Sequence, residues 1–152
     1  VVATSPRWSQ DTWQRKAPYL FYNFKTSHTI GHVARAIMEG ICFGVRGNLD
    51  QLERAAGRPF TAVLLTGGLA RVPFWAQMMA DVLGRPISVP EVAEPAAIAG
   101  AQLVLWGRGN TGSLPESPQI RHEPDAEVHS DYEQFYQSYL DVFTRLQREF
   151  AA

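Results

Sequence analysis

The sequence predicts an α/β fold in which helices pack on a mixed β-sheet. Residues 62–65 form an unbroken apolar run, which is typical of a strand covered on both faces in a parallel or mixed sheet. The pair Gly67–Gly68 follows this run and leads into an amphipathic helix near Pro73. A much longer amphipathic pattern over residues 28–56 indicates a second helix, which is expected to pack on the sheet along its length.

The composition of the 152-residue chain is that of a globular domain with a core. Hydrophobic residues make up 45% and charged residues 19% of the sequence. The net charge of -1 and the absence of a basic block argue against a nucleic-acid partner. The sequence contains neither an apolar stretch long enough to cross a membrane nor a recognisable signal peptide. Cys42 is the only cysteine, which excludes an internal disulfide and fits a reducing compartment.

The N-terminal third is predicted to contain an extended segment, a strand and the long helix. The first 18 residues hold prolines and tryptophans among polar residues, so they are either an extended loop with aromatic anchors or a lip over a ligand cleft. Residues 19–24 (YLFYNF) are rich in aromatic side chains and predict a strand. Thr26 or Ser27 is expected to cap the helix that follows. The apolar stripe of that helix comprises Ile30, Val33, Ile37, Ile41, Val45, Leu49 and Leu52.

The central unit runs from the apolar strand through the glycine pair to a helix that ends at Gly84. Pro73 suits the first helical turn because it lacks an N–H, and Gly84 can adopt the left-handed conformation that ends a helix. Helix N-termini attract phosphate through their free N–H groups, and glycines let a ligand approach the backbone. The turn is therefore either a nucleotide site or an ordinary tight turn. The buried helix face is expected to comprise Trp75, Met78, Met79, Val82 and Leu83.

A short strand and a slim helix follow. Residues 86–90 (PISVP) predict a strand, and the proline at each end favours an edge position or a very short pairing. The helix is expected from Glu94–Pro95 to about Trp106. Small residues over 96–101 would let it lie tight against a neighbour.

The C-terminal part is predicted to be a loop followed by a helix. Residues 108–127 are rich in glycine, proline, serine and charge, which indicates a surface loop. The final helix, over 130–150, is expected to begin with a capping box formed by Ser130 and Glu133. Its regularly spaced aromatic residues predict a buried inner face.

Few side chains suggest catalysis or metal binding. His28 and His32 lie four residues apart, but the sequence shows no HExxH arrangement and no third ligand, so surface or cap roles are favoured over a metal site. Asp81 lies between apolar helical positions and is expected to face solvent. The sequence contains neither a G-x-S-x-G motif nor a Walker-type loop. The residues thus predict a possible nucleotide turn and no catalytic group.

Three segments, in the order in which they occur, resemble the C-terminal domain of the FGGY carbohydrate kinases. They are SHTIGHVARAIMEGICFGVR (27–46), TGGLARVPFWAQMMADVLGRPISVPE (66–91) and EPAAIAGAQLVLWG (94–107). The xylulokinase-like members are most similar, and the run from Gly67 to Trp75 is quite specific. The resemblance covers nearly the whole chain apart from residues 108–127. Residues 1–152 are accordingly interpreted as a fragment comprising this single C-terminal domain.

The resemblance implies a partial actin-like ATPase (ribonuclease H-like) domain. In the family, two such domains enclose a cleft, with ATP largely against the C-terminal domain and the sugar largely against the N-terminal one. The family's adenosine-side loop maps onto Gly67, Gly68, Leu69 and Val72. Many relatives have a third glycine at the place of Leu69 and a serine at that of Val72. The family's catalytic aspartate belongs to the N-terminal domain, so no catalytic residue is expected here.

The function implied is that of the ATP-side domain of a cytoplasmic kinase that phosphorylates a ketose- or polyol-type carbohydrate with ATP and Mg²⁺. These residues alone are expected to be inactive, with the sugar bound through the missing N-terminal domain. The alternative is a non-catalytic nucleotide-binding or interaction module of the same fold. An isolated fragment with exposed apolar faces is expected to self-associate, for instance as a homodimer.

Overall fold

The computed structural model describes residues 2–4, 20–91, 95–112 and 117–150. The predicted aromatic lip therefore lies almost entirely outside the described residues. The elements, in chain order, are β1 (Val2–Thr4), β2 (Leu20–Tyr22), α1 (Ile30–Ala56), β3 (Val63–Leu64), a 3₁₀ turn (Gly68–Arg71), α2 (Pro73–Leu83), β4 (Ile87–Pro90), α3 (Pro95–Gly107), β5 (Gln119–His122) and α4 (Ala126–Phe150).

A mixed sheet in the order β3–β4–β5 confirms the predicted α/β class. Strand β3 runs parallel to β4, with Val63 opposite Ile87, whereas β4 and β5 are antiparallel. The predicted edge position of residues 86–90 is wrong, since β4 is the central strand. Its prolines precede the strand or end it, so the interior N–H groups stay available for pairing. Strands β1 and β2 form a separate antiparallel pair.

Strand β3 is less covered than its apolar sequence predicts. Leu64 is 55% exposed, while Val63 and Leu65 are half-buried against the core. The prediction of a strand buried on both faces is therefore wrong for the described residues. The uninterrupted apolar run indicated the strand correctly but not the number of its faces that are covered.

The segment predicted as a surface loop, 108–127, contains β5 and the start of α4. The sequence did not indicate β5, because this strand is exposed and mostly polar and lies at the edge of its sheet within the described residues. Arg121 of β5 pairs with Glu123, which follows the strand. The predicted capping box at Ser130 is also wrong. Asp125 caps α4 instead, because its Oδ1 accepts N–H groups of the first turn at 2.9 and 3.1 Å.

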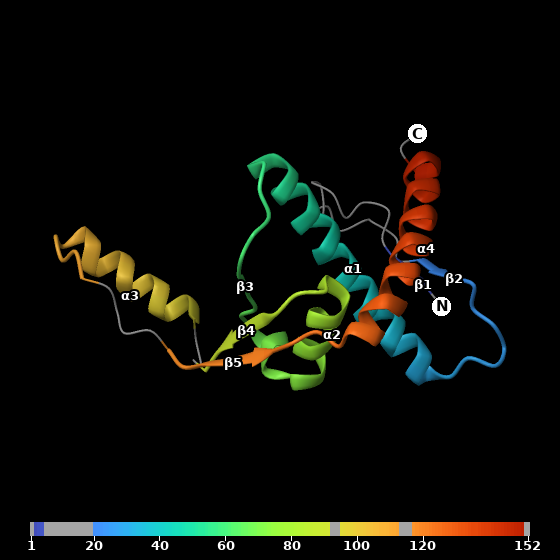
Figure 1. Ribbon diagram of the computed structural model, residues 1–152, viewed down its shortest axis with the longest axis horizontal. Helices are drawn as coiled ribbons and strands as arrows, with labels where there is room; N and C mark the ends of the chain where they lie inside the picture. The colour runs from blue at the N-terminus through green and yellow to red at the C-terminus, as the bar shows by residue number, and fades with distance from the viewer. Residues whose placement is uncertain (1, 5–19, 92–94, 113–116, 151–152) are drawn as a thin grey trace.

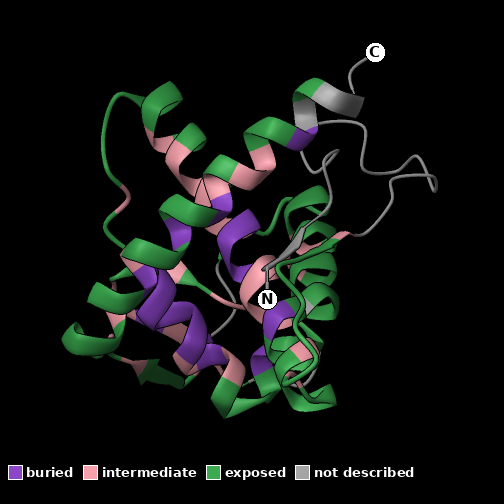
Figure 2. Cartoon of the chain, turned by 90° about the vertical axis from the view of Figure 1, so that its right-hand side faces the viewer, coloured by how far each residue is buried: buried purple, intermediate pink, exposed green. Residues whose placement is uncertain are grey.

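The core lies where α1, α2 and α4 meet, and Figure 2 shows their buried faces turned toward one another. Helix α2 is the best-buried of these elements, and the expected face of Met78, Met79, Val82 and Leu83 is confirmed. On α4, three tyrosines surround the ring of Phe43 at centroid distances of 5.3–6.1 Å, which confirms the predicted aromatic face for these residues. These tyrosines are Tyr132, Tyr136 and Tyr139. Phe135, which was expected on the same face, is exposed, so that part of the prediction is wrong.

Helix α1 begins and packs differently from the prediction. Thr29, not Thr26 or Ser27, is its N-cap residue. In the predicted stripe, Ile30, Ile37 and Leu52 are exposed, because the buried face centres on Cys42 and Phe43. The helix packs mainly on β1, α2 and α4 rather than along the β3–β4–β5 sheet.

Helix α3 forms over the expected residues but stands apart from the other helices (Figure 1). Its small residues over 96–101 are exposed, so the expected tight contact is not made within the described residues. Leu103, Val104 and Trp106 are more than half exposed, which leaves the helix with an apolar surface turned to solvent. Among the described residues, no helix combines the length and the apolarity that crossing a membrane requires.

Candidate functional site

The candidate site is the turn that joins β3 to α2 and contains Gly67, Gly68, Leu69 and Val72. The strand direction persists past β3, because the N–H of Leu65 donates to the carbonyl of Ser88 on β4 at 2.9 Å. Gly67 then adopts φ 94°, a conformation that residues with a Cβ rarely adopt. One 3₁₀ turn follows, closed by the N–H of Ala70 to the carbonyl of Gly67 at 3.2 Å. The turn thus carries the chain directly from the sheet to the start of α2.

The turn is open to solvent. All four candidate residues are exposed, with Leu69 at 47% and Val72 at 44%. A Cβ atom built on Gly67 or Gly68 would meet no other atom within 4 Å. The two flanking elements adjoin, since Val72 both ends the 3₁₀ turn and caps α2. The structure therefore brings the four residues together on one exposed turn that no described side chain fills.

The N-terminus of α2 adds a positive electrostatic end to this turn. Pro73 occupies the first helical turn as predicted, and the carbonyl of Val72 accepts the N–H groups of Trp75 and Ala76 at 2.9 and 3.2 Å. The side chain of Val72 makes no cap, and the first turn of α2 holds no acidic residue. The partial positive charge of the helix end is therefore not offset locally, which favours an anionic ligand.

Asp81, expected to face solvent, is buried, and that expectation is wrong. Its Oδ1 accepts hydrogen bonds from the N–H of Asp125 and from Nε2 of Gln77, both at 2.9 Å. Nδ1 of His129 lies 2.8 Å from the backbone carbonyl of Asp81 and donates to it, because a carbonyl only accepts. Asp81 thus joins α2 to the start of α4, through a partner that lies 44 residues away in the sequence.

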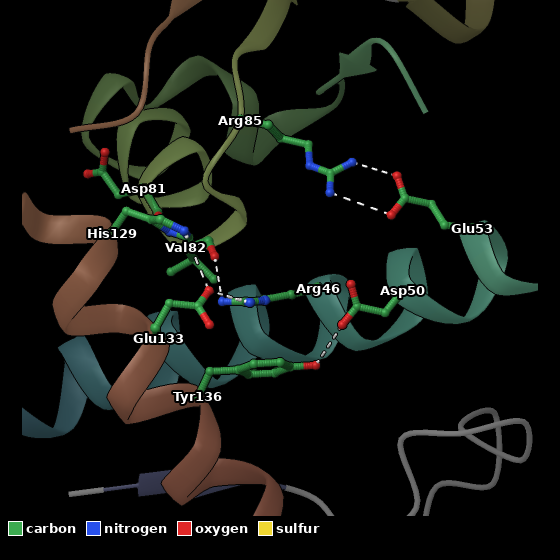
Figure 3. A network of polar contacts seen from close by, with 9 residues as sticks. All are labelled: Arg46, Asp50, Glu53, Asp81, Val82, Arg85, His129, Glu133 and Tyr136. Carbon is green, nitrogen blue, oxygen red and sulfur yellow. Dashed lines mark hydrogen bonds and ion pairs between the residues drawn. The ribbon is translucent and has the colours of Figure 1, made fainter. Parts of the chain in front are cut away.

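Arg46 of α1 holds the C-terminal end of α2 from the other side (Figure 3). Its Nη1 donates to the carbonyl of Val82 at 3.1 Å, and its Nη2 pairs with Glu133 of α4. The guanidinium also lies 4.2 Å from the ring centroid of Tyr136. Since α2 is anchored at this end to α1 and α4, the opposite end, at the glycine turn, has a defined position.

The Tyr136 hydroxyl completes this contact by donating to Oδ2 of Asp50 at 3.3 Å. Burial, followed by the nearby charge of Asp50, raises the pKa of Tyr136 to about 12. The hydroxyl therefore stays protonated at neutral pH and continues to donate. Tyr136 links α4 to α1 and has no part in the chemistry of the turn.

The two histidines singled out by their spacing have the cap roles predicted for them. Nδ1 of His28 accepts the N–H of Lys25 at 2.8 Å, and Nδ1 of His32 accepts the N–H of Thr29 at 3.1 Å. Both rings lie beside the start of α1, far along the chain from the glycine turn. Within the described residues, no group of three potential metal-ligating side chains comes together.

Cys42 lies in the core and is fully buried. Burial, followed by the charge of Glu39, raises the pKa of the Cys42 thiol to about 12. The thiol is therefore protonated at neutral pH and is a poor nucleophile.

Comparisons with known proteins give a consistent result. Residues 9–106 match the family model described as the FGGY family of carbohydrate kinases, C-terminal domain. The match includes all four residues of the candidate turn. An L-xylulose/3-keto-L-gulonate kinase from Escherichia coli K12 is 32% identical over 84% of this chain, and a gluconokinase from Bacillus licheniformis is 27% identical over 91% of it.

Among solved structures, that of a xyloylose kinase from Brucella ovis aligns with a TM-score of 0.75 and 27% identity over 88% of the chain. The matched regions make up 28% of that structure and 26% and 28% of the two curated relatives. The chain thus spans about a quarter of the length of the proteins it matches.

Proposed function

Because the chain belongs to the FGGY family of carbohydrate kinases and has part of their actin-like ATPase fold, we propose that it is the nucleotide-side domain of a sugar kinase. The observation that carries this proposal is the open glycine turn at the N-terminus of α2, which lies inside the matched region. The parent kinase would transfer the γ-phosphoryl group of ATP to a hydroxyl of a ketose- or polyol-type carbohydrate. The relatives' names, which include a gluconate and a xylulose kinase, support the carbohydrate class rather than one sugar.

The residues of the turn would bind and orient the nucleotide. Gly67 and Gly68 leave the backbone accessible, so that the adenosine can lie directly against it. The N-terminus of α2 would favour the anionic portion of the nucleotide through its free N–H groups and its dipole. Mg²⁺, bound mainly by the phosphates, would neutralise charge during transfer. Closure of a second domain over the turn would exclude water.

Gly68→Ala in the 152-residue chain tests this proposal. The backbone of Gly68 does not have positive φ and an added methyl group meets no protein atom, so the fold is expected to tolerate it. The methyl group would nevertheless occupy the space assigned to the nucleoside. Isothermal titration with ADP is expected to show binding to the wild type and an affinity about tenfold lower for the variant, a loss of ~1.4 kcal/mol.

Gly31→Ala is the matched control, because Gly31 lies at the start of α1 and an added Cβ makes only an ordinary contact, 3.6 Å from Thr29. Its ADP affinity is expected to equal that of the wild type. Equal affinity of Gly68→Ala and the wild type would mean that Gly67–Gly68 is an ordinary strand-to-helix turn.

A non-catalytic nucleotide-binding or interaction module of the same fold is the second candidate function. The exposed apolar side chains of Leu69 and Val72 favour it, because they stand on the turn itself and offer a nucleotide no polar contact. The gene sequence upstream of Val1 separates the two candidates. A glycine/threonine phosphate loop and a catalytic aspartate encoded there would support the kinase, and their absence would support the module.

A further inference from the structure

Glu53 touches both ends of the segment that carries the candidate turn. This carboxylate lies in the last turn of α1, and one of its oxygens, Oε1, accepts the N–H of Phe60 at 2.7 Å. The same oxygen accepts Nη1 of Arg85 at 2.6 Å, and Oε2 lies 3.5 Å from Nη2 of Arg85 (Figure 3). Phe60 lies just before β3, and Arg85 lies between α2 and β4.

These contacts close a loop in the chain. The segment from Phe60 to Arg85 comprises β3, the glycine turn and α2, and its first amide and its last side chain meet at one carboxylate. The α1 terminus is built to present that carboxylate. Gly57 adopts φ 65° and reverses the chain, so that the N–H of Phe60 points back toward the helix.

The strand held by this closure has little pairing of its own. Strand β3 contributes two residues to the sheet, Val63 and Leu64, with one further hydrogen bond from Leu65 to Ser88. Such a short pairing fixes the register weakly, and a slip of one residue would reverse the faces of the strand. The position of β3 along its own axis, relative to β4, decides where Gly67 lies relative to the N-terminus of α2. An anchor at Phe60 therefore acts on the turn through the strand.

The location of Glu53 supports a specific role for the pair. The C-terminal end of a helix carries a partial negative charge, which repels a carboxylate in the last turn. This position is therefore unfavourable for Glu53 unless a cation lies beside it. Arg85 supplies that cation with two donors, and the side chains of Glu53 and Arg85 are only 16% and 29% exposed. Partly buried pairs with forked geometry hold their partners more rigidly than exposed ion pairs do.

We propose that Glu53 and Arg85 form a clasp that positions the Gly67–Gly68 turn for its nucleotide. Both are positioning residues, since they act through β3 and α2 and do not contact the ligand. The inference rests on the proposed function for its ligand, but the clasp itself has a consequence that needs no ligand. Loss of the clasp should loosen the β3–turn junction before it loosens the core.

Hydrogen exchange and ADP binding on the 152-residue chain test the clasp together. The reporters are the amide of Leu65, which is hydrogen-bonded just before the turn, and that of Ala70, which is hydrogen-bonded within it. Glu53→Ala is expected to accelerate their exchange about tenfold more than that of the α2 core amides, and to weaken ADP binding about tenfold. Glu53→Gln keeps an oxygen for the N–H of Phe60 but loses the ion pair, so an intermediate effect on both readouts is expected.

Glu39→Ala is the matched control, because Glu39 is another carboxylate of α1, with 19% of its side chain exposed, whose contacts with Arg35 of α1 and Tyr132 of α4 lie outside the closed loop. When the two variants are compared at equal loss of thermal stability, the control is expected to keep the ADP affinity of the wild type. Its exchange rates at Leu65 and Ala70, taken relative to those of the core amides, should also be unchanged. If both variants change these readouts equally, the clasp is an ordinary stabilising contact and the proposal is overturned.

Two further outcomes remain decisive. If the wild type binds no ADP, the proposed function fails, whereas the exchange of Leu65 and Ala70 still decides the clasp. If Glu53→Ala does not fold, Arg85→Lys takes its place, because lysine keeps the charge but loses the forked pair of donors. Faster hydrogen exchange confined to Leu65 and Ala70 in Arg85→Lys would support the clasp. An equal acceleration of exchange across the whole chain would overturn it.

Discussion

Val72 occupies a position at which the side chain usually helps to begin a helix. It is the N-cap residue of α2, but valine has no oxygen that could accept an N–H from the first turn. Its exposure on the glycine turn means that the side chain contributes little to the core. The residue therefore leaves the α2 terminus both electropositive and unsatisfied by any side chain, which suits a turn that receives an anion.

Val72→Ser is expected to stabilise the chain by about 1 kcal/mol, because serine at an N-cap accepts an N–H of the first turn. Urea denaturation followed by circular dichroism measures the change. Val72→Ala is the control, since it removes the valine methyl groups without adding an acceptor. Equal stability of the serine and alanine variants would mean that the α2 terminus is already satisfied.

The carboxylate of Glu53 gives the stability a defined acid dependence. The hydrogen bond from Arg85, followed by that from the N–H of Phe60, holds the pKa of Glu53 below its ordinary value of 4.5. A pKa lowered by folding means that the unfolded chain binds the proton more readily. The stabilisation is therefore fully present above about pH 4.5 and is lost as the pH falls through the lower, folded value.

Glu53→Gln should remove this contribution. The difference in free energy of unfolding between the wild type and Glu53→Gln is expected to be largest near neutral pH and to shrink as the pH falls below about 4.5. Urea titrations in an acid series measure it, with Glu133→Gln as a second variant for comparison. A difference that stays constant through the acid range would contradict the ion pair.

At the scale of elements, the glycine turn is held by contacts far from it. Helix α2 is anchored to α4 through Asp81 and to α1 through Arg46, both near its C-terminal end. Its N-terminal end is left exposed beside Gly67–Gly68. The helix is thus fixed at one end by polar contacts and along its length by the core, while the other end remains accessible to a ligand.

Asp81→Ala is expected to cost about 1–3 kcal/mol, because the N–H of Asp125 and the amide of Gln77 would lose their buried acceptor. Amides in the first turn of α4 should also exchange faster, since Asp125 begins that helix. Asp141→Ala is the control, because Asp141 is an exposed aspartate of α4. Equal costs at the two positions, measured by urea denaturation, would show that Asp81 does not secure α4.

The sequence predicted elements whose signals are local. The periodicity of α2, the proline at its start and Gly84 at its end were sufficient to place the helix, and the glycine pair placed the turn. The resemblance to the FGGY C-terminal domain is likewise confirmed. The roles of the four turn residues stay predictions, because their exposure fits a ligand site but names no ligand.

Features that depend on distant partners could not be predicted in this way. Asp81 has the sequence context of a surface residue, and only the approach of Asp125 makes it a buried acceptor. The face of α1 was misplaced because Phe43, surrounded by the α4 tyrosines, outweighs a stripe of aliphatic residues at helical spacing. Strand β5 has no apolar alternation, because neither of its faces is buried.

At the scale of the whole molecule, both α3 and β3 carry apolar side chains that are turned to solvent. Leu103, Val104 and Trp106 on α3 and Leu64 on β3 each expose more than half of their surface. Strand β3 is also an edge of its sheet in the described residues. Exposed apolar helices and sheet edges promote association. The chain is therefore expected to interact with itself when it is studied alone.

Light scattering at increasing concentration should show a mass above that of the monomer. Replacing Leu103 and Val104 together by glutamine is expected to lower the association, because these side chains make α3 apolar without contributing to the core. Phe135→Gln, which changes an exposed aromatic residue on α4, is the control and should leave the association unchanged. A wild-type chain that remains monomeric at high concentration would contradict this expectation.

Catalysis by the 152 residues alone is the strongest test of how function is divided within the proposed kinase. Phosphoryl transfer needs a base for the sugar hydroxyl and charge that clamps the phosphates, both positioned within a closed site. The turn offers backbone, two glycines and apolar side chains, and the buried carboxylate of α2, Asp81, is committed to hydrogen bonds with α4.

The chain is therefore expected to bind ADP while giving no ATP turnover that depends on added xylulose or gluconate. A coupled assay measures this, with a full-length relative as the positive control. Sugar-dependent turnover by the chain would mean that it carries its own catalytic base, and the assignment of these residues to nucleotide binding alone would be wrong.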